Sequence, residues 1–273
     1  TQNTLIGGLA GDAITTGVAN TALGYLALST NITASNNTAI GTSALGANTT
    51  GTENVGLGRF ALYASTTGNY NTAVGTNALF TNTTAYNNTA VGSNALFANT
   101  TGASNVAIGR EALTTNTTAS NNTAVGYSSL GANITGEDNT AVGRNALLLN
   151  TTGTRNSALG SLALDANTTA NDNTAIGYAA LTGNTTGAGN VALGTYALVT
   201  STTAGSNTAI GRSALASNTT ASNNTALGYS AMTANTTGAN NVALGYYSLS
   251  ANTTGANRTA IGFESSKGSD TET

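Results

Sequence analysis

Asn71-Thr72-Ala73-Val74-Gly75 opens a 17-residue unit that recurs without insertion or deletion from Asn3 to Ile261. The unit starts sixteen times, at Asn in fifteen copies and at Arg258 in the last. A period this short has no room for two helices, so it predicts a solenoid whose coils stack one on the next. We therefore expect an all-β fold, a parallel β-solenoid or β-roll of about sixteen 17-residue coils. Positions within a coil are numbered here from 1, the opening Asn, to 17.

The repeat predicts one domain and a tail. Residues 1–262 are expected to form a single solenoid array whose degenerate first coil is a candidate cap. Residues 263–273 break the pattern and are polar, which is typical of a C-terminal cap or linker.

Three positions of the coil are apolar. Position 4 is always Val, Ile or Leu, and position 9 is Leu in nearly every complete coil, so both are expected to form inner columns. Position 3, Ala in fourteen coils, must face the opposite way from position 4 because side chains alternate along a strand. The expected coil has two short strands, one over positions 1–5 and the other near positions 8 and 9.

Position 5 is Gly in every coil, which predicts a positive φ angle at a corner or a close backbone approach. The structural glycines at the centre of the array are Gly75, Gly92, Gly109, Gly126 and Gly143.

Composition excludes several function classes. Charged residues are 6% of the chain and its seven basic residues are dispersed, so no nucleic-acid partner is expected. No run of eighteen apolar residues is present, so direct membrane insertion is not expected. Cys and His are absent and the carboxylates share no column, so we expect no cofactor, no metal and no catalytic residues. The chain is predicted not to be an enzyme.

Position 12 forms an Asn-x-Thr sequon in most coils, which is a candidate N-glycosylation site or an Asn ladder that stabilises a turn. Ser65 and Ser201 replace Asn there, and Ser can keep a turn hydrogen bond but cannot accept an N-glycan, so the ladder is favoured. The position-12 asparagines are Asn31, Asn48, Asn82, Asn99, Asn116, Asn133, Asn150, Asn167, Asn184, Asn218, Asn235 and Asn252. Position 17 carries a second sequon set with the same alternatives, at Asn36, Asn87, Asn121, Asn223 and Asn257.

Position 6 is rich in Tyr and Arg, the residue types that dominate binding hot spots. An exposed stripe of them is a candidate surface for a glycan or a protein, although covering the core edge or closing a contact between chains is favoured. The stripe consists of Tyr25, Arg59, Arg110, Tyr127, Arg144, Tyr178, Arg212, Tyr229 and Tyr246. At position 10, Tyr63, Phe80 and Phe97 predict an aromatic ladder over three consecutive coils.

Two segments, Asp172-Asn173-Thr174-Ala175-Ile176-Gly177-Tyr178-Ala179-Ala180 and Ser104-Asn105-Val106-Ala107-Ile108-Gly109, resemble the head repeats of trimeric autotransporter adhesins. They are also similar to repeats of phage tail-fibre and bacterial surface proteins. The resemblance implies a left-handed parallel β-roll in which three chains wrap around one axis. In that arrangement the position-3 alanines would face the axis.

The expected function is a non-enzymatic structural or adhesive rod of an extracellular fibre, on a cell surface or a virion appendage. We expect lateral packing into a homo-oligomer, with a trimer favoured, because the Ala column would otherwise leave an exposed apolar strip. The alternatives are a self-assembling filament subunit and a module that binds a glycan or cell-surface protein through the position-6 stripe. Ice binding by the position-2 threonines ranks low.

Overall fold

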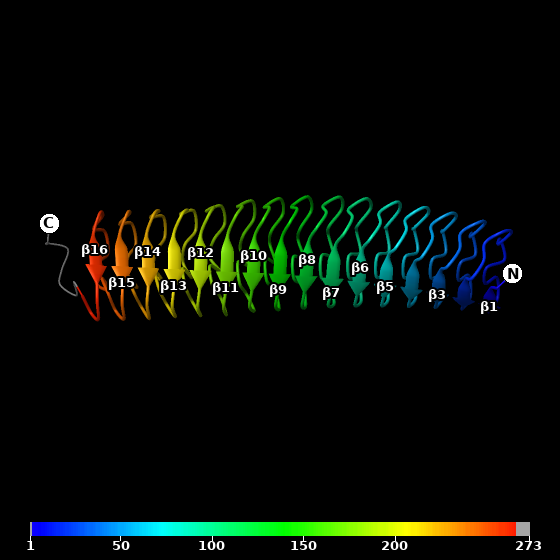
Figure 1. Cartoon of the computed structure of the whole chain (residues 1–273), viewed down its shortest axis with the longest axis horizontal. Helices are drawn as coiled ribbons and strands as arrows, with labels where there is room; N and C mark the ends of the chain where they lie inside the picture. Colours follow the sequence, from blue (N-terminus) through cyan, green and yellow to red (C-terminus); the bar gives the residue numbers. More distant parts are fainter. Residues whose placement is uncertain (1, 266–273) are drawn as a thin grey trace. The chain divides into compact units, whose positions relative to one another are not determined.

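The computed structural model describes residues 2–265, which are all-β and contain no helix (Figure 1). Each 17-residue coil contributes one three-residue strand, at positions 2 to 4. The chain divides into two compact units, one that ends at Asp138 and one that begins at Asn139. The first holds β1 (Thr4–Ile6), β2 (Thr21–Leu23), β3 (Thr38–Ile40), β4 (Val55–Leu57), β5 (Thr72–Val74), β6 (Thr89–Val91), β7 (Val106–Ile108) and β8 (Thr123–Val125). The second holds β9 (Thr140–Val142), β10 (Ser157–Leu159), β11 (Thr174–Ile176), β12 (Val191–Leu193), β13 (Thr208–Ile210), β14 (Thr225–Leu227), β15 (Val242–Leu244) and β16 (Thr259–Ile261).

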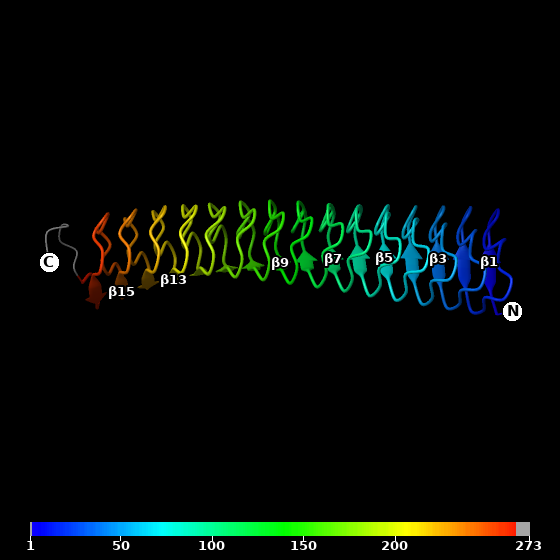
Figure 2. The same cartoon turned by 90° about the horizontal axis from the view of Figure 1, so that it is seen from above.

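Within each unit, neighbouring strands pair in parallel and in register. Thr72, Ala73 and Val74 of β5, for example, lie opposite Thr89, Ala90 and Val91 of β6. Figure 2 shows the coils of each unit lying side by side with the same orientation. The predicted parallel β-solenoid with one coil per repeat is therefore confirmed. Of the expected tail, residues 266–273 lie outside the described part of the chain.

The second strand expected near positions 8 and 9 was a wrong prediction. Those positions belong to a turn, in which the Ala78 N–H donates to Gly75 O at 3.4 Å. Leu79 has a left-handed φ of 52°, a conformation that cannot continue a strand. The turn is still tied to its neighbour, because the Leu79 N–H donates to Ala95 O of the next coil at 3.0 Å.

The leucine column at position 9 is inside the solenoid, as predicted. Leu79 and Leu96 are fully buried, and so are the alanines at positions 3 and 8. A Cβ added to Gly56 at position 3 would lie 3.4 Å from Cγ of Leu45. Positions 3 and 9 therefore face each other, and position 3 is small because the leucine fills the interior.

The inner column predicted at position 4 was wrong, and so was the outward Ala face at position 3. Strand β5 has a buried Ala73 between a half-buried Thr72 and a half-buried Val74. Alternation along the strand makes positions 2 and 4 share the outer face once position 3 points inward. The aliphatic residues at position 4 therefore cover the outside of the sheet.

Glycine at position 5 meets both of the expected requirements. Gly75 has a φ of 136°, and a Cβ there would lie 2.6 Å from the carbonyl oxygen of Gly92 in the next coil. No L side chain fits this corner, because it would have to overlap the neighbouring backbone.

Candidate functional site: the side-chain columns

The position-12 asparagines form a ladder inside the coils. Nδ2 of Asn99 donates to Oδ1 of Asn82 in the preceding coil at 2.9 Å and to Gly102 O in its own coil at 2.9 Å. Nδ2 of Asn116 then donates to Oδ1 of Asn99 at 3.0 Å. All twelve candidate asparagines are buried, so the folded coil has no room for a glycan on any of them.

A second ladder at position 1 was missed by sequence reasoning. The Asn71 N–H donates to Oδ1 of Asn54 at 2.9 Å, while its Nδ2 donates to Ala85 O at 2.8 Å. Nδ2 of Asn82, from the first ladder, reaches the same Ala85 O at 3.2 Å. The two ladders therefore meet on the position-15 carbonyl and brace the return turn. The signal was available, since position 1 is Asn in fifteen of sixteen coils.

Two serines interrupt the position-12 ladder. Ser65 and Ser201 are fully buried. Within the part of the chain that the structure describes, neither Oγ has a hydrogen-bond partner, and Oδ1 of Asn48 and of Asn184 in the preceding coils also lacks one. The expectation that Ser would keep a turn hydrogen bond was therefore wrong. Its side chain is too short to reach the groups that an Asn amide contacts.

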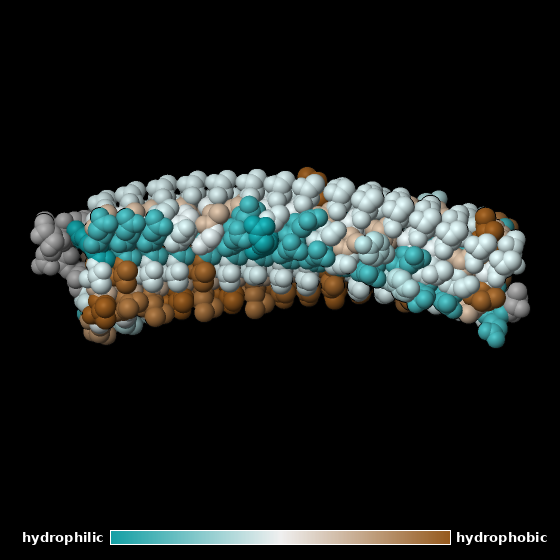
Figure 3. Space-filling view, turned by 45° about the horizontal axis from the view of Figure 1, so that its top comes forward, coloured by the Kyte–Doolittle hydropathy of each residue, from teal (hydrophilic) through white to brown (hydrophobic). Residues whose placement is uncertain are grey.

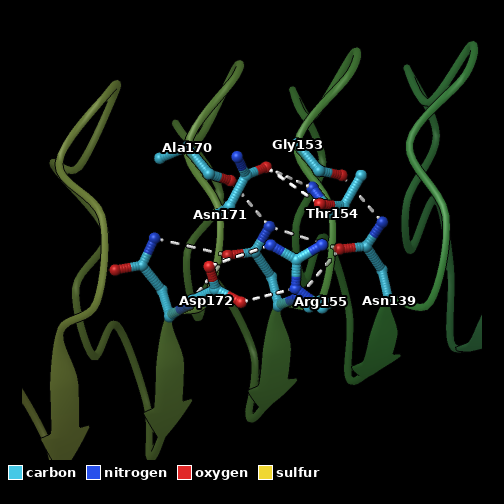
Figure 4. Close-up of polar contacts among 9 residues, drawn as sticks. Asn139, Gly153, Thr154, Arg155, Ala170, Asn171 and Asp172 are labelled. Carbon is cyan, nitrogen blue, oxygen red and sulfur yellow. Dashed lines mark hydrogen bonds and ion pairs between the residues drawn. The ribbon is translucent and has the colours of Figure 1, made fainter.

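The exposed edge at positions 16 and 17 is linked from coil to coil by polar side chains (Figure 4). The Thr154 N–H donates to Oδ1 of Asn171 at 2.7 Å, and Arg155 makes a two-point ion pair with Asp172 at 2.7 and 3.0 Å. Figure 4 also shows the Asn139 amide directed at Gly153, whose carbonyl it reaches at 2.9 Å. The Arg155 hydrogen bond lowers the pKa of Asp172. Because the pair is exposed, it stabilises the fold little.

The second sequon set lies on this same exposed edge. All five of its asparagines are exposed, and each has a left-handed φ, such as 60° at Asn36 and 62° at Asn121. Asn tolerates this conformation better than most residues, which accounts for its frequency at position 17.

The nine residues of the position-6 stripe are all exposed. Several of them contact the position-6 residue of an adjacent coil. The Arg110 guanidinium lies 5.7 Å from the Tyr127 ring centroid, and its pKa is raised by the hydrogen bond to Glu111. Tyr229 and Tyr246 stack with ring centroids 5.3 Å apart.

The position-10 aromatic ladder is present. Phe80 stacks on Tyr63 at 5.3 Å and on Phe97 at 5.2 Å between ring centroids. Phe60 at position 7 also joins this cluster, 5.4 Å from Tyr63. The sequence pattern did not assign Phe60 to the cluster, because the left-handed turn that brings positions 7 and 10 together was not anticipated.

The outer face of the sheet exposes a column of aliphatic side chains. In the unit of β9–β16 it forms a continuous hydrophobic strip (Figure 3). Position-4 side chains supply it, and Leu159 is 50%, Leu193 42% and Leu227 45% exposed. The unit of β1–β8 has the same column, with Leu23 43% and Leu57 41% exposed.

Other kinds of site find little support. Residues 2–265 contain no group of three or more Asp or Glu side chains that could hold a metal ion. The same residues include no helix with the length and apolar character needed to cross a membrane. Neither a protein-family model nor a curated protein matches the chain.

Proposed function

We propose that this chain is a non-enzymatic structural segment of an extracellular fibre or surface appendage, in which copies associate laterally through the outer sheet face. The observation that carries the proposal is the strip of exposed Leu and Ile and half-buried Val at position 4. Soluble monomers rarely expose a contiguous apolar patch above roughly a few hundred Å². An apolar column that runs over eight strands of one unit is the kind of surface that a partner chain normally covers.

The parallel sheet supports the same conclusion. Parallel sheets are nearly always covered on both faces. Here the Ala face is covered by the coil's own leucines, while the Thr and aliphatic face is bare. A second copy of the chain offers an identical in-register surface. The copies would therefore pack through position 4, where the sequence had suggested position 3.

We favour a homotrimer on a cell surface or virion because of the resemblance to trimeric adhesin and tail-fibre repeats. The stacked coils of each unit suit a spacer or adhesive rod, since a solenoid lengthens by adding coils without changing its cross-section. Electron microscopy of the purified chain should show rods of one length. Growing fibres would instead favour the self-assembling filament.

Native mass spectrometry of the double variant Leu193→Lys/Leu227→Lys tests the lateral contact. Two charges on the outer face should reduce a wild-type trimer to monomers while the far-UV circular dichroism stays unchanged. The matched control Asn223→Lys, on the exposed edge, should remain trimeric. A monomeric wild-type protein would contradict lateral association and leave the solenoid in place.

The position-6 stripe supports a second candidate, a surface that binds a glycan or a cell-surface protein. Its Tyr and Arg side chains are exposed and recur at the same position of the coil, and such residues contribute strongly to binding. Replacing Arg110, Tyr127 and Arg144 together should abolish binding on a glycan array if this surface is used. Undiminished binding would exclude the stripe.

A further inference from the structure

Two places inside the coils contain the same set of buried polar atoms without a hydrogen-bond partner. At the first, Ser65 follows Asn48 in the position-12 column, and over residues 2–265 both the Ser65 Oγ and the Asn48 Oδ1 are buried and unpaired. At the second, Ser201 follows Asn184, and the same two atoms are unpaired. Leaving such groups unpaired away from water is costly, so each place calls for a partner outside the protein.

The coil after each serine supplies a third polar group. Nδ2 of Asn82 donates to the position-15 carbonyl of its own coil at 3.2 Å, and Nδ2 of Asn218 does so at 2.9 Å. An amide nitrogen carries two N–H donors. Asn116 gives its second one to Oδ1 of Asn99 in the preceding coil, but the preceding coils of Asn82 and Asn218 have a serine there. In the described chain, one N–H of each therefore remains for a further acceptor.

The serine side chain does not reach the place that an Asn amide occupies. A Cβ added to Gly51, three residues after Asn48, would lie 2.5 Å from Oδ1 of that asparagine. For Gly68, three residues after Ser65, the three nearest atoms include Nδ2 of Asn82 at 3.2 Å and no atom of Ser65. Ser lacks a carbon and a nitrogen that Asn has, and a water molecule takes up a similar volume, roughly 30 Å³. The place beside Ser65 therefore suits one water and faces the Asn82 amide.

We infer that each serine holds one buried water molecule, which completes the position-12 ladder. At the first site the water accepts from Nδ2 of Asn82, donates to Oδ1 of Asn48 and shares a hydrogen bond with Oγ of Ser65. The equivalent groups around Ser201 bind the second water. Buried waters typically make about three hydrogen bonds to polar groups that would otherwise be unsatisfied, which is the number available at each serine.

The same three groups exclude other occupants. An N–H donor directed at the site disfavours a cation, and an amide oxygen directed at it disfavours an anion. A larger molecule has no way in, because Asn48, Ser65 and Asn82 are all fully buried. The inference does not depend on lateral association, since both sites lie inside the coils and away from the outer sheet face.

Oxygen-17 relaxation dispersion of water, which counts long-lived internal waters, tests the inference. Ser65→Asn and Ser201→Asn should each lower the count by one per chain, and the double variant should lower it by two, because an Asn amide takes the place of the water. Both variants introduce the residue that twelve other coils carry at position 12, so the coils should keep their fold. The matched control is Ser104→Asn at the exposed position 17, which should leave the count unchanged.

A high-resolution crystal structure of the wild type should locate the two waters. Each should lie about 2.7–3.2 Å from the serine Oγ and from the two neighbouring amides. In Ser65→Asn the water beside that residue should be gone, while the one beside Ser201 remains. An unchanged count in the double variant, or no density beside either serine, would overturn the inference. Density that is replaced by rubidium when the crystals are soaked in rubidium chloride would identify a monovalent cation and overturn it as well.

Discussion

Nδ2 of Asn99 lies 2.9 Å from Oδ1 of Asn82, one coil below it, and both side chains are completely buried. Each such bond satisfies an amide that would be costly to leave unpaired away from water. The bond also couples one coil to the next from inside. Where Ser65 follows Asn48, this hydrogen bond between coils is missing. Restoring an Asn at that position should therefore stabilise the protein.

Completing the ladder should stabilise the protein. Ser65→Asn is expected to raise the free energy of unfolding by about 1 kcal/mol, because it pairs the buried Oδ1 of Asn48 and adds an amide that can reach the position-15 carbonyl. Urea midpoints of the variant and the wild type measure the effect. Ser65→Ala serves as the control, since it removes the unpaired Oγ without filling the gap. A lower midpoint for Ser65→Asn than for Ser65→Ala would contradict the ladder as a source of stability.

Truncation of the inner leucine column should be costly. Leu147→Ala is expected to lower the free energy of unfolding by about 2–5 kcal/mol, because a fully buried side chain leaves a cavity. Leu147→Asp should be worse, since it places a charge in a dry column. Leu149 is 49% exposed two residues later, and Leu149→Ala should change stability by less than about 0.5 kcal/mol. Equal effects of the two alanine variants in chemical denaturation would refute the inner-column assignment.

The left-handed residues at position 17 offer a test of backbone strain. Tyr70 has a φ of 58° and is 55% exposed. Tyr70→Asn should stabilise the protein by roughly 0.5–1 kcal/mol, because Asn adopts this conformation at lower cost. Tyr70→Val should destabilise it, since a β-branched residue is disfavoured there. Thermal melts that rank Val above Asn would show that strain at this corner is unimportant.

The Arg155–Asp172 ion pair should affect the pKa of Asp172 more than it affects the stability of the protein. The Asp172 pKa is lowered in the folded protein, so its stabilising contribution is present above the unfolded-state pKa and is lost as pH falls through the folded-state value. Arg155→Gln should raise the Asp172 pKa toward its ordinary range, as measured by carbonyl-detected NMR. High salt should have a similar but smaller effect on the wild type. A pKa that does not respond to Arg155→Gln would mean that the ion pair is not formed in solution.

Much of the architecture follows from the repeat alone. A strict 17-residue period with an aliphatic strand motif specifies stacked parallel coils, since only equivalent positions can then lie opposite one another. Leu at position 9 was also assigned correctly to the interior, and Gly at position 5 to a corner without room for a Cβ. The role of the position-12 asparagines was harder to predict. An Asn-x-Thr sequence looks the same whether its Asn carries a glycan or forms a hydrogen bond inside the coil.

The three-dimensional packing decided which strand face points inward. Alternation assigns Ala73 and Val74 to opposite faces, but it is symmetric and does not say which face is the interior. The larger residue was expected inside, yet the coil already holds Leu79 from a turn that periodicity did not reveal. With that leucine and the buried Asn amides in place, only an alanine fits across from them. Val74 is therefore left on the outer face of the sheet.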